Sequence, residues 1–402
     1  MSETLEFYPV PGIRLGTAGA GIKYPDRDDL VVMELAEGST CAAVFTRNAF
    51  CAAPVVVARE HLAAVMPRYL LINSGNANAG TGDNGLRAAR EACKAVAAAR
   101  ACAINQVLPF STGVIGEPLP VDRIAVAVPD ALTALSERGW ERAARAIMTT
   151  DTVPKLISRQ LELSGKTVTV TGMAKGSGMI RPDMATMLAY IATDALVDRQ
   201  LLQQCLERAV KPSFNSISVD GDTSTNDACI LVASGVSGCS PITDQASADF
   251  AKLCEVVEDV CMQLARAIVL DGEGATKLVE IRVEEAASEQ EARDVAYTIA
   301  HSPLVKTALF ASDPNWGRIL AAVGRAGIEQ LAIEPIRIWL DDVCIVRDGG
   351  RAADYSEAAG QRVMQQDQLS IRVALGRGEA KTRVLTCDLS YEYVKINAEY
   401  RT

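Results

Sequence analysis

The segment 173–188 places a threonine at the junction between a glycine- and methionine-rich loop and an apolar run. The run from Thr186 to Thr193 is partly β-branched, which predicts a buried strand. A hydroxyl at its first residue acts as a nucleophile if a base lies beside it, and the nearest base is the residue's own backbone nitrogen. That nitrogen becomes an amine only when the bond between Ala185 and Thr186 is cut. The pattern alone favours the other interpretation, a buried threonine that bonds the backbone, because threonine is common at strand starts.

Other bases are scarce in this sequence. Its two histidines, His61 and His301, are expected at the surface or at helix caps, and they leave little room for a Ser/His/Asp triad. The number of cysteines, 11, is odd, and no pair has Cys-x-x-Cys spacing. Most cysteines lie in apolar or alanine-rich runs, so we expect free, buried thiols in a reducing cytosol and no metal site.

The composition is that of an ordinary globular protein. A length of 402 residues predicts two domains or one large layered unit. With 49% hydrophobic and 22% charged residues, and with abundant alanine, valine and glycine, the sequence suits packed α/β layers. The net charge of −10 argues against a nucleic-acid or anionic-membrane partner. The N-terminus lacks a signal-peptide pattern and no apolar run approaches the roughly 18 residues of a membrane span, so we expect a cytoplasmic protein.

Turn signals and apolar runs predict the elements that must position Thr186. Residues 1–60 indicate antiparallel strands joined by tight turns, and 156–172 indicate a hairpin just before the loop. Helices are expected where apolar residues recur with helical spacing, at 86–100, 198–210, 246–269 and 288–301. Further strands are expected at 69–73, 276–283, 336–340, 371–375 and 389–397, the last because its apolar residues alternate clearly.

Three glycine-rich or polar stretches suggest ligand sites. Residues 80–85 fit G-x-G-x-x-G, but no acidic residue follows about twenty positions later, so a helix start packed closely by glycine is better supported than dinucleotide binding. The Ser-Thr-Gly turn at 111–113 can form a nest of backbone N–H groups that binds an anion. The loop 213–227 is dense in Ser, Thr, Asn and Asp, which fits a small polar ligand and solvated turns equally well.

Seven motifs run in order along essentially the whole chain. They are SGNANAG (74–80), STGVIG (111–116), TTDT (149–152), KGSGMI with the following proline and MATML (175–188), DGEGAT (271–276), DPNWGR (313–318) and a terminal Asn397. Together they resemble the ornithine acetyltransferase family, the glutamate N-acetyltransferases of arginine biosynthesis. The resemblance implies a layered α/β/β/α sandwich and not a Rossmann fold.

The same resemblance implies self-cleavage between Ala185 and Thr186. The products are an α chain, 1–185, and a β chain, 186–402, which stay together as a heterotetramer of two α and two β chains. Thr186 then carries a hydroxyl and a free α-amine with an ordinary pKa of about 7.7–8.0, so no histidine is needed.

The implied reaction moves an acetyl group from N-acetylornithine to glutamate through an acetyl ester on Thr186. Thr112 and the backbone N–H of Gly113 are implied to stabilise the oxyanion, which agrees with the nest expected at that turn. Lys175 would disfavour protonation of the Thr186 amine, and Glu273 would meet the cationic amine of the substrate. No step is implied for 313–318. The implied substrate contacts are Thr152, Lys175, Thr186, Glu273, Asn397 and Thr402.

Two questions stay open at this stage. The alternative function is a self-cleaving amidase or aminopeptidase in which water replaces glutamate, followed by a non-catalytic binding protein and a dinucleotide oxidoreductase. No motif decides whether acetyl-CoA serves as a second acyl donor. Apart from that substrate, no cofactor is implied.

Overall fold

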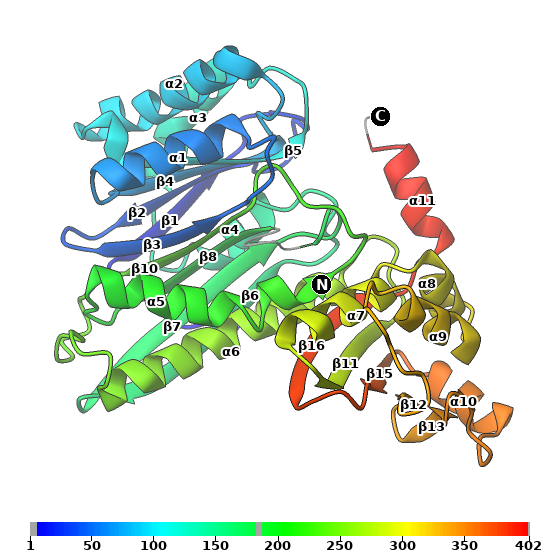
Figure 1. Ribbon diagram of the computed structural model, residues 1–402. Coiled ribbons are helices and arrows are strands. Elements are labelled where there is room, and N and C mark those ends of the chain that lie inside the picture. The colour runs from blue at the N-terminus through cyan, green and yellow to red at the C-terminus, as the bar shows by residue number, and fades with distance from the viewer. Residues whose placement is uncertain (1–5, 182–186, 401–402) are drawn as a thin grey trace. The chain divides into compact units, whose positions relative to one another are not determined.

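The computed structural model describes residues 6–181 and 187–400 (Figure 1). The chain packs as two compact units. The first comprises 1–176, 182–215 and 223–268, and the second comprises 177–181, 216–222 and 269–402. These units are defined by how the chain packs. The predicted division into 1–185 and 186–402 is instead defined by a cleavage site, so it stays a prediction.

The first sheet of the first unit contains, in spatial order, β1 (Ile13–Ala18), β2 (Leu30–Leu35), β4 (Tyr69–Asn76) and β5 (Val107–Val114). Its first two pairings are antiparallel and β4 pairs with β5 in parallel. Helix α2 (Gly82–Arg100) connects β4 to β5, as a parallel pair requires. The G-x-G-x-x-G stretch opens this helix, and a Cβ on Gly85 would lie 2.0 Å from Thr81 Oγ1. The glycine therefore serves close packing at the helix start, as predicted.

The second sheet of the first unit has the order β3-β10-β8-β7-β6. Its strands are β3 (Thr40–Phe45), β10 (Ala228–Ala233), β8 (Leu188–Thr193), β7 (Lys166–Lys175) and β6 (Lys155–Leu163). Strand β8 is central and buried throughout, with β10 parallel on one side and β7 antiparallel on the other. The predicted strand 186–193 is thus confirmed from Leu188 on, and Thr186 lies outside the described residues.

These two sheets share one core, and helices cover their outer faces. Val31 and Met33 of β2 pack in the same cluster as Tyr190 of β8, whereas Leu30 and Val32 pack with α2 and α3 (Val121–Thr133). Helices α5 (Arg199–Val210) and α6 (Ala248–Leu270) pack on the second sheet, α5 against β3 and α6 against Gly172 of β7 (Figure 1). This arrangement confirms the predicted α/β/β/α sandwich. The remaining helices of this unit are α1 (Ala53–Ala64), the short η1 (Ile104–Gln106) and α4 (Trp140–Ala146).

The second unit is built on a seven-stranded sheet of order β14-β13-β12-β15-β11-β16-β9. The strands are β9 (Ile217–Ser218), β11 (Leu278–Ala286), β12 (Arg337–Leu340), β13 (Val343–Arg347), β14 (Gly350–Arg351), β15 (Gln368–Ala374) and β16 (Ala380–Cys387). Helix α7 (Glu289–Ala300) packs on β11 and β16, where Val295 and Ile299 meet Ile281 and Val283 in one core. The other helices are α8 (Pro303–Phe310), α9 (Trp316–Gly324), α10 (Glu357–Met364) and α11 (Tyr391–Ala398). The short η2 (Phe214–Ser216) spans the chain's passage from the first unit into the second.

One predicted element is wrong. The alternating stretch 389–397 is not a strand, because residues from Tyr391 on form α11. This helix buries none of its residues, and Tyr391 is 83% exposed, so the apolar alternation does not reflect a buried sheet face. The prediction for 1–60 also omitted α1. The hairpin 156–172 and the four predicted helices are confirmed to within a few residues at their ends.

The histidines and cysteines differ in how well they match expectation. His301 is the C-cap residue of α7, as expected, but His61 is buried inside α1, where Nδ1 lies 2.8 Å from the Val107 carbonyl. All 11 cysteines are free thiols, eight of them buried, as predicted. In the described ranges, no helix is long and apolar enough to cross a membrane.

Candidate active site

Thr112 and Gly113 lie near the end of β5, beside the end of β4. The parallel register sets Gly113 against Gly75, and a Cβ on Gly113 would come within 2.3 Å of the Gly75 carbonyl carbon. The φ of Gly113 is 133°, a conformation that L side chains rarely adopt. Glycine is therefore required at this position, and Thr112, which is buried, is fixed by the strand that ends there.

Lys175 is the last residue of β7 and contacts Thr112 directly. Its Nζ donates a hydrogen bond to Thr112 Oγ1 over 3.1 Å, and both side chains are buried. In the antiparallel register Lys175 pairs with Leu188, the residue two positions after Thr186 in the chain. The ends of β5 and β7 thus contribute to one buried polar cluster, and β8 begins beside β7.

Asp151 anchors this cluster from the turn before β6. Its Oδ1 accepts hydrogen bonds from Lys155 Nζ over 2.6 Å and from the Gly176 backbone N–H over 2.7 Å. Burial acts to raise the pKa of the Asp151 carboxyl, but the charges of Lys175 and Lys155 and the Gly176 hydrogen bond outweigh it and hold the pKa at about 2. The carboxylate is therefore ionised at neutral pH, and it fixes the residue that follows Lys175.

Asp227 is a second buried carboxyl near Lys175. It directly precedes β10, and the backbone N–H of Ala228 donates to the Met187 carbonyl over 3.0 Å. Burial raises the pKa of Asp227 well above its ordinary value, against the opposing effects of Ser224 and Lys175. Its Oδ2 accepts no hydrogen bond from any described residue.

The second unit holds two of the predicted substrate contacts. Asn397 Nδ2, on α11, donates to Glu273 Oε2 over 2.8 Å, and Glu273 is buried in the turn after α6. The backbone of Gly178 passes so close that a Cβ there would lie 2.4 Å from the Glu273 carboxyl carbon. The carboxylate is thus held by one amide donor and by close packing against a glycine.

The structure brings five of the predicted site residues together in two groups. Thr112 and Lys175 meet in the first unit, with Gly113 adjacent, while Glu273 and Asn397 meet in the second. Thr152 follows Asp151 in the turn but is itself exposed. The residues Ala185, Thr186 and Thr402 lie outside the described residues.

Sequence reasoning missed the two aspartates. Asp151 is part of the TTDT motif, from which only Thr152 was predicted as a site residue. Asp227 ends the polar loop 213–227. A signal was available for Asp227, since an acidic residue directly before a wholly apolar run is expected to be buried with the strand. The motif 313–318 proves to be a helix start, in which Asn315 caps α9 by accepting from the Arg318 backbone N–H.

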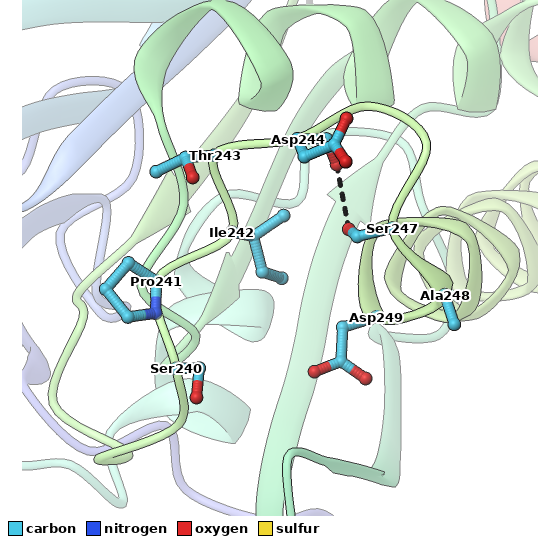
Figure 2. A pocket seen from close by; sticks show the side chains of 8 residues that line it. All are labelled: Ser240, Pro241, Ile242, Thr243, Asp244, Ser247, Ala248 and Asp249. Carbon is cyan, nitrogen blue, oxygen red and sulfur yellow. Dashed lines mark hydrogen bonds between the residues drawn. The ribbon is translucent and has the colours of Figure 1, made fainter.

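A cavity of about 320 Å³ lies away from the predicted residues, in the first unit. It lies at the start of α6, where Ser247 Oγ donates to the Asp244 carbonyl over 2.8 Å (Figure 2). Most of its lining side chains are exposed, and none belongs to the predicted site. Across the described part of the chain, no three His, Cys, Asp or Glu side chains gather as metal ligands would.

The layered fold is that of a mixed α/β protein and not a Rossmann fold. A model of the ArgJ family matches residues 14–402, and the chain belongs to that family. The arginine biosynthesis bifunctional protein ArgJ of Methylococcus capsulatus is 62% identical over 98% of this chain and 96% of its own. Its counterpart in Pseudomonas fluorescens is 57% identical over 98% and 97%.

A solved structure gives the same assignment. The crystal structure of arginine biosynthesis bifunctional protein ArgJ from Bacillus halodurans is 40% identical, covers 53% of this chain and 99% of that chain, and superposes with a TM-score of 0.50. These matches confirm the resemblance found in the sequence. The chain is an acetyltransferase of the ArgJ family, and the family acts in arginine biosynthesis.

Proposed function

We propose that this protein transfers an acetyl group from N-acetylornithine to glutamate through an acetyl ester on Thr186, after cutting its own chain between Ala185 and Thr186. The observation that carries the proposal is the hydrogen bond from Lys175 Nζ to Thr112 Oγ1 at the end of β7, which pairs in register with the start of β8. A buried ammonium and a hydroxyl are thereby held near the strand that the nucleophile precedes.

The reaction follows from the groups that the cut releases. The Thr186 hydroxyl attacks the acetyl carbonyl carbon and passes its proton to its own α-amine, which is the base. Thr112 and the Gly113 N–H stabilise the oxyanion, and removing one such donor costs about 10²–10³ in rate. The C–N bond then breaks, ornithine leaves with the proton, and the acetyl group remains on Thr186 Oγ1.

Glutamate completes the cycle. Its amine attacks the ester carbonyl, the C–O bond breaks, and Thr186 regains its hydroxyl proton as N-acetylglutamate leaves. Lys175 supports the free-base form of the Thr186 amine through its charge, and it contacts substrate together with Thr152. Glu273, Asn397 and Thr402 contact the amino-acid part of the substrate, where the Glu273 carboxylate suits an ammonium group.

The proposal includes a second acyl donor, acetyl-CoA, because the curated relatives at 57% and 62% identity are named bifunctional. It also includes a cytoplasmic heterotetramer of two α and two β chains. Neither extension is needed for the core reaction, and each has its own test. Incubation with acetyl-CoA and glutamate alone tests the donor, and the mass of the native particle tests the assembly.

Intact-mass measurement tests the core proposal. The purified protein should give two fragments, the second beginning at Thr186, whereas Thr186→Ala should give one 42.8 kDa chain without transferase activity. Thr186→Ser keeps a hydroxyl and should still be cut. A wild-type protein that transfers acetyl groups as the uncut chain would contradict the mechanism, and acetate release without N-acetylglutamate would indicate an amidase.

A further inference from the structure

The segment 19–28, which connects β1 to β2, is held beside the end of β4 in the first unit. The two carboxylate oxygens of the buried Asp29 accept hydrogen bonds from the backbone N–H groups of residues 20 and 22, each over 2.6 Å. The Asp29 carbonyl accepts from the Ser74 N–H over 2.9 Å. Because Ser74 pairs in register with Thr112, this segment, which we call the β1–β2 loop, borders the proposed oxyanion site.

Arg27, on the same loop, is held by neutral groups. Its Nη2 donates to Ser74 Oγ over 3.3 Å and to the Met148 carbonyl. No carboxylate of the described residues pairs with its half-buried guanidinium, and its Nε and Nη1 groups donate to no acceptor among them. A guanidinium with spare donors binds phosphate well, because two parallel N–H groups match two phosphate oxygens.

An aromatic ring brings a second cation to Arg27. Lys23 Nζ lies 5.2 Å from the centre of the Tyr24 ring, and Arg27 Cζ lies 6.0 Å from the same centre. Lys23 also packs against β4, since a Cβ on Gly75 would lie 3.0 Å from Lys23 Cβ. Tyr24 is 48% exposed, so a ligand can reach this part of the loop from solvent.

The carboxylates of the loop do not cancel its positive charge. Asp28 is paired with Arg142 of α4, whose Nε donates to Oδ2 over 2.6 Å, and this leaves Asp26, which is exposed. Arg123 of α3 adds a further cation, because its Nη1 donates to the Gly21 carbonyl over 2.5 Å. The cations outnumber the carboxylates, with Lys23, Arg27, Arg123 and Arg142 against Asp26, Asp28 and Asp29. A positive region in a protein of net charge −10 favours an anionic ligand at this place.

We propose that the β1–β2 loop binds the phosphate groups of acetyl-CoA. The residues that bind them are Arg27, Lys23 and Arg123, and the acetyl end extends from there to the oxyanion site at 112–113. This inference rests on the proposed use of acetyl-CoA as a second acyl donor. N-acetylornithine carries no phosphate, so a contact that serves acetyl-CoA alone is expected next to the oxyanion site and outside it.

The chemistry of the second donor follows that of the first. The Thr186 hydroxyl attacks the thioester carbonyl carbon, the C–S bond breaks, and coenzyme A leaves as the thiol with the proton of that hydroxyl. The same acetyl ester remains on Thr186. The β1–β2 loop therefore affects loading from acetyl-CoA and leaves the later transfer to glutamate unchanged.

The experiment compares acetyl-CoA with S-acetylpantetheine, a donor with the same thioester but without phosphate. With glutamate as the acceptor, kcat/KM for acetyl-CoA should exceed that for S-acetylpantetheine about 100-fold in wild type, since hydrogen bonds to charged groups each contribute about tenfold or more. Arg27→Gln should lower this ratio about tenfold, and Arg123→Gln, whose side chain is exposed, about threefold. A ratio between two donors is unaffected by a general loss of activity or stability.

Arg59→Gln is the matched control. Arg59, on α1 of the same unit, also lies over an aromatic ring, with Cζ 5.3 Å from the centre of the Phe45 ring, and it donates to the Thr46 carbonyl. Neither contact involves the β1–β2 loop, so this variant should keep the wild-type ratio. Arg27→Lys keeps a charge but loses the paired N–H groups, and its ratio should lie between those of wild type and Arg27→Gln.

The outcomes separate this inference from the proposed function. An unchanged donor ratio in Arg27→Gln would overturn the role of the loop and leave the proposed function intact. An equal loss in Arg59→Gln would overturn it as well, since the effect would not then be local. If Arg27→Gln raised KM for N-acetylornithine as much as KM for acetyl-CoA, the cations would serve a substrate carboxylate, and the inference would be wrong.

The wild-type protein gives the last distinction. Acetyl transfer from N-acetylornithine without any transfer from acetyl-CoA would overturn this inference and support the core reaction. A wild type that is inactive with N-acetylornithine would overturn the proposed function itself.

Discussion

Lys175 Nζ and Thr112 Oγ1 are joined by a buried hydrogen bond of 3.1 Å that links the end of β7 in the second sheet to the end of β5 in the first. Behind it, Asp151 binds Lys155 and the Gly176 N–H. The ammonium of Lys175 thus binds a hydroxyl group, and its charge helps to keep the nearby Asp151 carboxyl ionised. The first three predictions concern this cluster.

Replacing Lys175 by methionine should lower kcat/KM for acetyl transfer about 100-fold or more, because the charge and the hydrogen bond to Thr112 are both lost. Asp151 keeps Lys155, so the fold should survive. Steady-state kinetics with N-acetylornithine and glutamate measure the effect. Lys166→Met, at the exposed start of β7, is the control and should behave as wild type. A Lys175→Met enzyme of normal activity would remove this lysine from the mechanism.

Asp151 should make stability depend on pH in the acid range. The pKa of about 2 in the folded protein lies below the ordinary aspartate value of 3.8, so its contribution is fully present above about pH 4 and is lost as pH falls through 2. A difference of this size corresponds to about 2 kcal/mol. Asp151→Asn removes the negative charge beside the buried Lys155 ammonium and should cost about 3–5 kcal/mol at pH 6.

Urea unfolding of wild type and Asp151→Asn at pH 6 and pH 2.5 measures both effects. The gap in unfolding free energy between the two proteins should shrink at the lower pH. Asp83→Asn, at an exposed position in α2, should leave the wild-type pH dependence unchanged. A constant gap at both pH values would contradict the assignment of Asp151 as the ionised partner.

Gly113→Ala should destabilise the protein and abolish transfer. The new methyl group would overlap the backbone of Gly75 and Asn76, and the φ of 133° is unfavourable for alanine. Gly116→Ala separates the two effects, because its φ of 86° is also positive but its Cβ would have no heavy atom within 4 Å. We expect about 1 kcal/mol for Gly116→Ala and at least twice that for Gly113→Ala, measured by thermal and urea unfolding. If both substitutions lowered the free energy of unfolding equally, the close approach of β4 to β5 would not be the reason that position 113 requires glycine.

Glu273→Gln should lower kcat/KM for acetyl transfer while leaving the fold intact. The amide preserves the shape beside Gly178, but it removes the charge expected to meet the substrate ammonium. A hydrogen bond to a charged group contributes about 1.5–3 kcal/mol, so kcat/KM should fall about 10- to 150-fold. Glu289→Gln, in the first turn of α7, provides a matched acidic control. Unchanged kinetics in Glu273→Gln would show that the carboxylate does not bind substrate.

The sequence predicted most of the first unit because its elements follow local rules. The continuous apolar run of β2 and the helical spacing in α2 are visible without a structure. The error at 389–397 has the opposite origin. Helix α11 buries none of its residues, so its apolar alternation carried no information about a sheet.

The site was predictable only in part. Lys175, Thr112, Glu273 and Asn397 came from the family motifs, and the contacts that pair them depend on residues 63 and 124 positions apart. The Asp220 carboxylate accepts hydrogen bonds from the backbone N–H groups of Met179 and Ile180. The sequence does not reveal this role, because Asp220 lies among turn-forming residues and an aspartate in a solvated turn looks the same. Such roles depend on which segment folds against the loop, and this is a tertiary property.

The central place of β8 has a consequence for the cleaved protein. In the second sheet, β7 belongs to the part of the chain before residue 185 and β8 and β10 to the part after it, and β8 is hydrogen-bonded on both edges. The two polypeptides made by the proposed cut thus share one sheet and separate only when that sheet unfolds. Folding is unimolecular for the precursor, but reassembly of the mature protein is bimolecular and concentration-dependent. Dilute, denatured enzyme should therefore recover poorly, although the uncut Thr186→Ala chain refolds.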